Sequence, residues 1–146
     1  MTQTDRFAAQ LLESGARGYA ALATAALIDR RPDLAEVEGA ATAWRAHLTQ
    51  RVLELQTAVA LGRSHLFVER VRWSRRAYHA RGVGESDLRD ALDCLRAVLD
   101  EELPPIGRET ALATLGEALA DFDREIEAGA RELDPESDQG RRALLY

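Results

Sequence analysis

Apolar residues recur at steps of three and four along most of this chain. Residues 34–61 show the spacing most clearly, with one helical stripe formed by Val37, Ala41, Trp44, Leu48, Val52, Leu55 and Val59. Leucines in residues 86–103 and 106–133 follow the same spacing. No window alternates polar residues with β-branched apolar ones, as a half-buried strand does. The pattern therefore predicts an all-α protein.

Glycine, proline and serine residues divide this pattern into about six helices. The helices are expected near residues 5–14, 16–30, 34–61, 64–80, 86–103 and 106–133. Gly15 and Gly18 break or bend the chain between the first two, because glycine is a poor helix former, and Pro32 stops the second. Ser64 and Ser86 are the expected N-caps of the fourth and fifth helices, since their hydroxyls can accept bonds from free backbone N–H groups.

Length and composition indicate one domain. A chain of 146 residues can bury a single core without disulfides, so we expect one domain over residues 1–134 and a flexible tail over residues 135–146. The single cysteine, Cys94, rules out an internal disulfide and suits the cytoplasm. The longest uncharged run, residues 18–28, is too short to span a bilayer, and no signal peptide is indicated.

One segment, residues 62–84, differs in charge from the rest of the chain. The net charge of the protein is −6, and all 19 basic residues are arginines. Within residues 62–84, six arginines and two of the three histidines accompany a single acid, Glu69. A nucleic-acid binder needs a basic field over a broad face. Because the field here is confined to one helix of an acidic protein, nucleic acid is disfavoured as a partner.

The side chains of this basic segment fall on two adjoining faces of the predicted helix. His65, Arg72 and His79 are spaced by seven residues and so lie near one line. Arg75 and Arg76 lie beside that line. The line borders an apolar face made by Phe67, Val68, Val71 and Tyr78. Arginine forks pair with carboxylates and an apolar wall buries a ring, so the pattern indicates either a site for a flat, carboxylate-bearing ligand or an ordinary amphipathic helix.

Other residues of the segment have two interpretations each. Trp73, with Leu66 and Ala77, forms a second apolar patch on the other flank, expected to pack against a neighbouring helix or a second subunit. His79 ends the helix before a glycine corner, where a neutral imidazole can ligate haem iron or lie on the surface near the helix dipole. His47, in the preceding helix, is expected to be a surface residue or a satisfied core residue.

Motifs for catalysis and for metal binding are missing from the sequence. We find no Ser-His-acid context, no Gly-rich phosphate loop after a strand, no paired Glu-x-x-His and no Cys or His cluster at zinc spacing. Cys94 follows Asp93 on a helix with acids around it, conditions that raise a thiol pKa, so a buried inert thiol is expected. The sequence favours a binding protein, with no metal site, over an enzyme.

The order of the predicted helices and the corner after His79 carry a resemblance that spans residues 4–134. A Pro-broken corner, a long helix and a helix that ends in His79 follow one another, and His79-Ala80-Arg81-Gly82-Val83 looks like the proximal-histidine corner of sensor globins. Gln50 lies where the distal residue of a globin is expected. The chain thus resembles a globin, which implies haem with His79 as axial ligand. Leu34 stands at the corner where haem globins place a phenylalanine, and this weakens the haem interpretation.

Four further segments carry a closer resemblance: Leu66–Trp73, Arg81–Val83, Leu88 with Leu92, and Glu101–Pro105. They are similar to the helical, globin-like domain ahead of cobalamin-binding domains in bacterial light-sensing proteins, and to stand-alone bilin-binding globins. The resemblance implies a linear tetrapyrrole such as biliverdin and a light- or ligand-dependent signal, so we expect a sensor or carrier. Cys94 could form a thioether to a bilin, but its expected burial favours binding without a covalent link. A homodimer is also expected.

In such a site the arginines at 72, 75 and 76 would hold the two propionates, and His79 or His65 would make the polar contact to the pyrrole nitrogens. Two other functions stay open: a haem-binding sensor globin, and a ligand-free globin-like module that dimerises and signals through its final helices. The cleft next to His79 separates them. An open slot favours a tetrapyrrole, whereas filling by Trp44, Phe67 or Tyr78 favours the ligand-free module.

Overall fold

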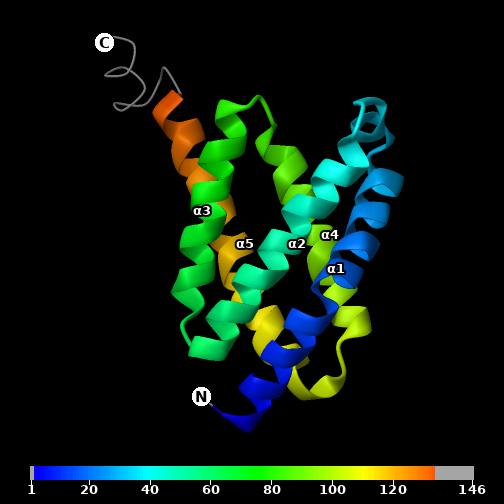
Figure 1. Cartoon of the computed structure of the whole chain (residues 1–146). Helices are drawn as coiled ribbons and strands as arrows, with labels where there is room; N and C mark the ends of the chain where they lie inside the picture. The colour runs from blue at the N-terminus through cyan, green and yellow to red at the C-terminus, as the bar shows by residue number, and fades with distance from the viewer. Residues whose placement is uncertain (1, 134–146) are drawn as a thin grey trace.

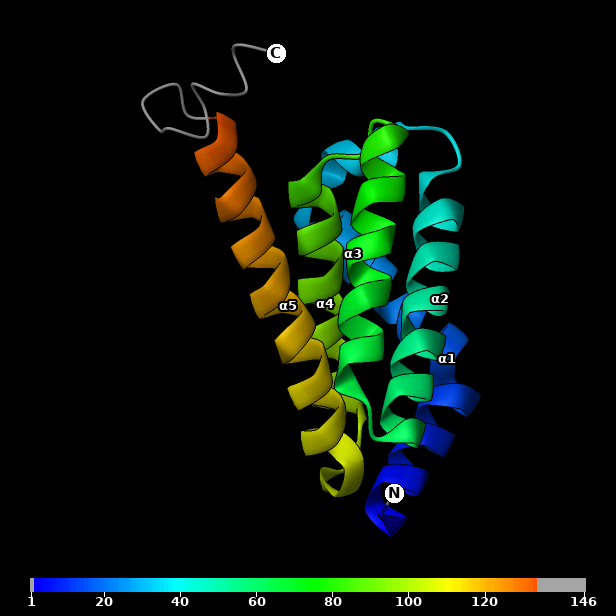
Figure 2. The ribbon, with the colours of Figure 1, turned by 90° about the vertical axis from the view of Figure 1, so that its left-hand side faces the viewer.

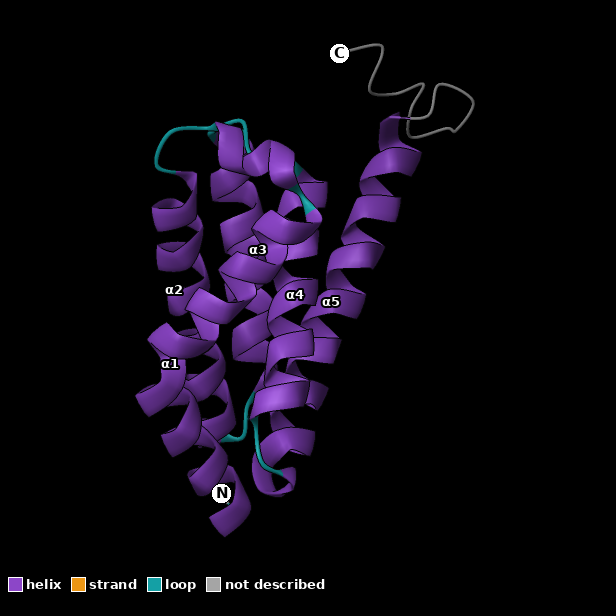
Figure 3. Ribbon diagram, turned by 90° about the vertical axis from the view of Figure 1, so that its right-hand side faces the viewer, coloured by secondary structure: helices purple, strands orange, loops and turns teal. Residues whose placement is uncertain are grey.

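The computed structural model describes residues 2–133, and the side chains of residues 2–130. Its elements are α1 (Gln3–Arg30), the short 3-10 helix η1 (Pro32–Glu36), α2 (Ala40–Leu61), α3 (Ser64–Ala80), α4 (Glu85–Glu102) and α5 (Pro105–Leu133). Every regular element in this range is a helix (Figure 3), which confirms the all-α prediction for it. The predicted tail, residues 135–146, lies outside the described residues.

The five α-helices form an elongated bundle (Figure 1). Each α-helix runs opposite to the one before it, so α1, α3 and α5 share one direction and α2 and α4 the other (Figure 2). α1 packs along α2, α4 and α5, while α3 packs against α2 and α5. None of the helices in residues 2–133 combines the length and apolar character needed to cross a membrane.

The predicted apolar stripes supply the core of the bundle. Leu48, Val52 and Leu55 of α2 are fully buried. The core is completed by the other large side chains that are at most 3% exposed, Leu12, Leu27, Val59, Phe67, Val71, Leu88, Leu92, Leu95, Leu99, Leu103, Leu115, Leu119 and Phe122. Two members of the predicted stripe, Val37 and Ala41, are exposed. Val37 precedes α2, which begins at Ala40.

α1 is one continuous helix where two were expected. It passes through Gly15 and Gly18 without a break. Its buried face consists mostly of alanines, with Leu12 and Leu27, and lies against α2, α4 and α5. Each glycine costs a helix about 1 kcal/mol relative to alanine. Packing along the whole length of α1 outweighs that cost, as tertiary contacts often outweigh propensity.

The segment before α2 also differs from the expectation of a helix from residue 34. Residues 32–36 form η1, and Gly39 has a left-handed φ of 75°. A helix cannot continue through that backbone conformation, so α2 begins at Ala40. η1 is held in place by Arg31, whose guanidinium binds Asp33 at 3.0 Å and, on α4, the carboxylates of Asp87 and Asp90 at 2.8 and 2.9 Å.

Neither serine predicted as an N-cap has that role. α3 begins at Ser64 itself, with Arg63 as its N-cap residue. The backbone N–H of Arg63 donates to the carbonyl of Ala58 at 3.0 Å, and this bond closes the turn between α2 and α3. α4 begins at Glu85, with Gly84 as its N-cap residue and no side-chain bond at the cap. The last helix starts near the expected position, although Ile106 and Gly107 have non-helical φ and ψ within α5.

Candidate functional site

Two of the predicted site arginines are bound to neighbouring helices. Arg72 donates from Nε and Nη2 to the Asp121 carboxylate of α5, at 2.8 and 2.6 Å. Asp121 is only 5% exposed, and this bond to Arg72 is the main reason that its pKa is lowered. Arg75 donates to Oε1 of Glu85 at 2.9 and 2.7 Å, with its guanidinium 5.8 Å from the centre of the Phe122 ring. Both side chains thus hold α3 to its neighbours.

The remaining polar members of the predicted site lie on the surface of α3. His65, Arg76 and His79 are exposed. Arg76 makes one long contact, from its Nε to the carbonyl oxygen of Arg72 at 3.4 Å. The expected line of His65, Arg72 and His79 exists on the helix, but Arg72 is bound to Asp121 of α5, and neither histidine lines the groove or the cavity described below.

The apolar wall of the predicted site belongs largely to the core. Phe67 and Val71 are 0% and 1% exposed, because this face of α3 packs against α2 and α5. Tyr78 is half-buried and lies edge-on to the ring of His47, with 4.6 Å between the ring centres. The helical periodicity located the apolar face of α3 correctly, and the neighbouring helices cover it.

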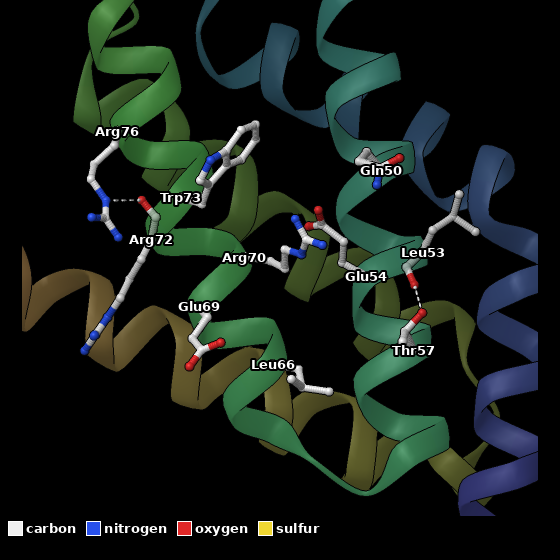
Figure 4. Close-up of a pocket in the computed structure, with 10 residues that line it drawn as sticks. All are labelled: Gln50, Leu53, Glu54, Thr57, Leu66, Glu69, Arg70, Arg72, Trp73 and Arg76. Carbon is white, nitrogen blue, oxygen red and sulfur yellow. Dashed lines mark hydrogen bonds between the residues drawn. The ribbon is translucent and has the colours of Figure 1, made fainter.

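A groove lies on the other flank of α3, between α2 and α3 (Figure 4). Its volume is about 870 Å³. It is lined by Gln50, Leu53, Glu54 and Thr57 from α2 and by Leu66, Glu69, Arg70, Arg72, Trp73 and Arg76 from α3. Trp73, Arg70 and Leu66 point from α3 toward α2 (Figure 4). Trp73 is 59% exposed, so the patch expected to pack against a neighbour is open in this chain.

The groove holds two arginines that are not engaged by carboxylates. Arg72 points away from the groove toward α5 (Figure 4), where it binds Asp121. Arg70 and Arg76 are therefore the lining arginines without a carboxylate partner among the described residues. On the opposite wall, the negative charge of Glu54 is offset by Arg51 at 2.6 Å. The α3 wall thus presents Arg70 and Arg76 together with the carboxylate of Glu69.

A buried polar row follows one face of α2, at positions 47, 51 and 54. Arg51 is 3% exposed and binds Glu54 through two contacts of 2.6 and 2.8 Å. Nη1 of Arg51 lies 3.4 Å from Nδ1 of His47. His47 is 4% exposed, and burial, helped by the charge of Arg51, lowers its pKa to about 3. Glu54 lines the groove, so the row reaches from the groove into the interior.

The row was missed by the sequence analysis, which expected His47 to be a surface or satisfied core residue. His47 is in the core, but its Nε2 has no hydrogen-bond partner within the described part of the chain. The spacing of three and four residues that unites His47, Arg51 and Glu54 could have shown that they share a face. That face adjoins the apolar stripe of Leu48, Val52 and Leu55, and this position on the helix is the signal that could have indicated burial of the row.

A second, smaller cavity lies beside the end of α3. Its volume is about 290 Å³, and it is lined by Leu34, Val37, Glu38, Gly39, Ala40, Ala43, Trp44, His47, Tyr78, Gly82, Val83 and Asp87. It lies where a cleft next to His79 was expected, between Tyr78 and the glycine corner, but His79 does not line it. Trp44 and Tyr78 narrow it, and its volume is at the low end of the range of about 300–1,000 Å³ for drug-sized ligands. It is too small for a tetrapyrrole.

Reactive and metal-binding groups are few in residues 2–130. Cys94 is buried, and burial is the main reason that its pKa is raised, in keeping with the expected inert thiol. No cluster of three or more His, Cys, Asp or Glu side chains in the described range is arranged to hold a metal ion.

Fold and site together define an all-helical bundle with an open groove between α2 and α3 and a small cavity beside it. No family model, curated protein or solved structure matches the chain. The resemblance to globins and to bilin-binding helical domains therefore stays a prediction from the sequence.

Proposed function

We propose that the protein binds a flat, carboxylate-bearing ligand, with a linear tetrapyrrole such as biliverdin as the best candidate, in the groove between α2 and α3. The observation that carries this proposal is the exposed Trp73 ring beside Arg70 and Arg76 in a groove of about 870 Å³. That volume lies within the usual range for ligands of drug size and above. The protein would act as a sensor or carrier of this ligand.

Each side of the groove would have a distinct part in binding. Trp73 and Leu66 offer apolar surface to the plane of the ligand. Arg70 and Arg76 offer guanidinium forks to two carboxylates. Gln50 and the hydroxyl of Thr57, which donates to the carbonyl of Leu53 at 3.1 Å, offer polar contacts for pyrrole nitrogens or terminal carbonyls. Of the sequence-based site, only Arg72 and Arg76 line this groove; the predicted residues outside it are His65, Phe67, Val71, Arg75, Tyr78 and His79.

A titration of the purified protein with biliverdin, followed by absorbance and by tryptophan fluorescence, tests the proposal. We expect saturable binding with a changed absorption spectrum. Trp73→Ala and Arg70→Gln should each weaken binding roughly tenfold or more, about 1.4 kcal/mol, because each removes one contact to the ligand. Arg96→Gln is the matched control, since Arg96 is an exposed arginine of α4 that does not line the groove.

Unchanged spectra with both biliverdin and haemin would refute tetrapyrrole binding. Binding that all three variants retain would place the ligand elsewhere. If haemin alone binds, and His79→Ala abolishes its Soret band, the haem-binding sensor globin becomes the better interpretation, with the exposed His79 as axial ligand.

One observation favours the ligand-free module as the second candidate. The cleft next to His79 is narrowed by Trp44 and Tyr78, and Phe67 is fully buried in the core. Under this alternative, Trp73 contacts a second copy of the chain and not a ligand. Sedimentation velocity would then show a dimer that the charge of Trp73→Arg disrupts, in protein that binds neither tetrapyrrole.

A further inference from the structure

We propose that one end of the bundle is an interface at which two copies of the chain associate end to end about a twofold axis. This end is formed by the start of α1, the turn between α2 and α3 and the turn between α4 and α5, which lie together in both views (Figure 1, Figure 2). None of its exposed apolar residues, Phe7, Leu61 and Ile106, lines the groove. The proposal therefore does not rest on ligand binding in the groove.

Exposed apolar side chains are concentrated at this end. Six large apolar side chains of the described residues are exposed, and three of them are Phe7, Leu61 and Ile106, at 40%, 58% and 62%. They belong to α1, α2 and α5, and the first and last of these helices touch here, since a Cβ built on Gly107 would lie 2.8 Å from the Cβ of Ala8. Removal of such apolar surface from water favours association.

The charges at this end are divided between the two turns. Arg63 and His65 are exposed at the α2–α3 turn, whereas Glu101, Glu102 and Glu109 are exposed at the α4–α5 turn. The ion pairs within the described residues are all made by other side chains. One end of the molecule thus presents a basic turn and an acidic turn whose charges are not neutralised by each other.

The same division of charge extends over the helices that the turns connect. Residues 40–80 contain seven arginines and two acids, whereas residues 85–130 contain four arginines and thirteen acids. Like turns of two copies therefore repel each other, and unlike turns attract. A surface that carries both signs is complementary to itself, which favours a second copy as the partner.

A twofold axis between the two turns satisfies both of them at once. Rotation by 180° places the basic turn of each copy opposite the acidic turn of the other, so the same contact forms twice. The shape of the end agrees with this arrangement, because the α2–α3 turn stops short of the α4–α5 turn and of the start of α1 (Figure 2). The recessed turn of one copy then faces the projecting turn of the other.

Charge-swap variants followed by sedimentation velocity test the proposal. We expect the wild-type protein to dimerise with a Kd on the order of 10–100 µM, because an interface confined to the ends of a few helices is small. Arg63→Glu and the double variant Glu101→Arg/Glu109→Arg should each weaken the dimer roughly tenfold or more, because like charges then face each other. A mixture of these two variants should dimerise again, since opposite charges meet at both contacts.

The matched controls reverse charges at the opposite end of the bundle. Arg81→Glu, in the α3–α4 turn, is the control for Arg63→Glu, and Glu36→Arg/Glu38→Arg is the control for the double variant. All three control positions are exposed. Both controls should dimerise as the wild type does.

Several results would overturn the proposal. The wild type could stay monomeric up to about 1 mM, well above the expected Kd, or the mixture of charge-reversed variants could fail to dimerise. Equal weakening by Arg63→Glu and Arg81→Glu would show an effect of net charge alone. A dimer that Trp73→Arg disrupts and the charge reversals do not would place the interface at the groove.

A second measurement decides the question if a variant does not fold. Amide NMR spectra of the wild-type protein are recorded over a range of concentrations. We expect shifts that depend on concentration to be confined to residues 5–9, 61–65 and 101–109. Shifts that lie elsewhere, or their absence, would contradict the proposed interface.

Discussion

The buried polar side chains of α2 differ in how the free-energy cost of their burial is offset. Arg51 and Glu54 neutralise each other through two short contacts, which is how buried charges are usually retained. His47 avoids the cost of a buried charge by staying neutral. Its remaining cost is the unpaired Nε2–H. His47 is therefore the residue of the row through which a fall in pH destabilises the folded protein.

The pH dependence of stability should show this directly. The pKa of His47 is lowered from 6.5 to about 3 in the folded protein, so between these values the unfolded chain binds a proton that the folded protein does not. Stability therefore falls as the pH falls through this window, at up to about 1.4 kcal/mol per pH unit. Urea unfolding at pH 6.5 and 4.5 should reveal an extra loss of roughly 2–3 kcal/mol relative to His47→Gln, whose amide does not titrate.

The carboxylates titrate in both proteins, so they cancel in this comparison. Asp121, whose pKa is lowered chiefly by its bond to Arg72, is one of them. Equal losses of stability in the wild type and in His47→Gln would show that His47 takes up its proton at an ordinary pH while folded.

At the scale of single residues, the sequence indicated which side chains are chemically able to bind a ligand, but not which ones have partners already. Arg72 and Arg76 are alike in the sequence. Arg72 is bound because Asp121, 49 residues later, reaches it from α5, whereas Arg76 remains exposed. Such long-range pairing leaves no local pattern, so the predicted site mixed arginines that hold the bundle together, Arg72 and Arg75, with one that has no carboxylate partner, Arg76.

Helix boundaries depend on both helix propensity and packing. Glycines at which an added Cβ would touch nothing show the effect of backbone conformation alone. An added Cβ would meet nothing within 4 Å at either Gly18 or Gly39. Gly18 is in the middle of α1, whereas Gly39 has a φ of 75°. Gly18→Ala should therefore stabilise the protein by about 0.5–1 kcal/mol, and Gly39→Ala should destabilise it by about 1–2 kcal/mol.

Thermal unfolding followed by circular dichroism measures both changes. About 1 kcal/mol corresponds to roughly 2–4 °C in Tm for a protein of this size. A drop in Tm for Gly18→Ala would mean that α1 needs a bend at this position, as in the predicted division into helices over residues 5–14 and 16–30.

For the elements as a whole, periodicity was a reliable guide to helix type and a poor guide to helix ends. The expected helices over 64–80 and 106–133 nearly coincide with α3 and α5. The errors lie at residues 15–18, where packing carries α1 through two glycines, and at residues 32–39, where η1 and a turn replace the start of α2. In both places the outcome depends on contacts with other helices, which the sequence does not specify locally.

Within the whole molecule, one close approach joins the first and last α-helices. Gly107 has a φ of 94°, and a Cβ built on it would lie 2.8 Å from the Cβ of Ala8. Gly107→Ala should thus suffer both backbone strain and overpacking, a loss of roughly 2–4 kcal/mol. Gly39→Ala has the backbone strain without a close contact. The difference between the two variants in the free energy of unfolding, measured with urea, therefore gives the part of the loss that is due to the contact with α1. Equal losses in the two variants would show that α1 and α5 can separate at this point without cost.

The continuous α1 has a consequence for how the protein is made. Its contacts with α2 involve only the first 61 residues, so they can form while the rest of the chain is still being synthesised. Its contacts with α4 and α5 require residues beyond 85. Until those residues leave the ribosome, the alanine-rich side of α1 that they will cover stays accessible. The nascent protein therefore passes through a stage in which a hairpin of two long helices offers an apolar surface to chaperones and to other nascent chains.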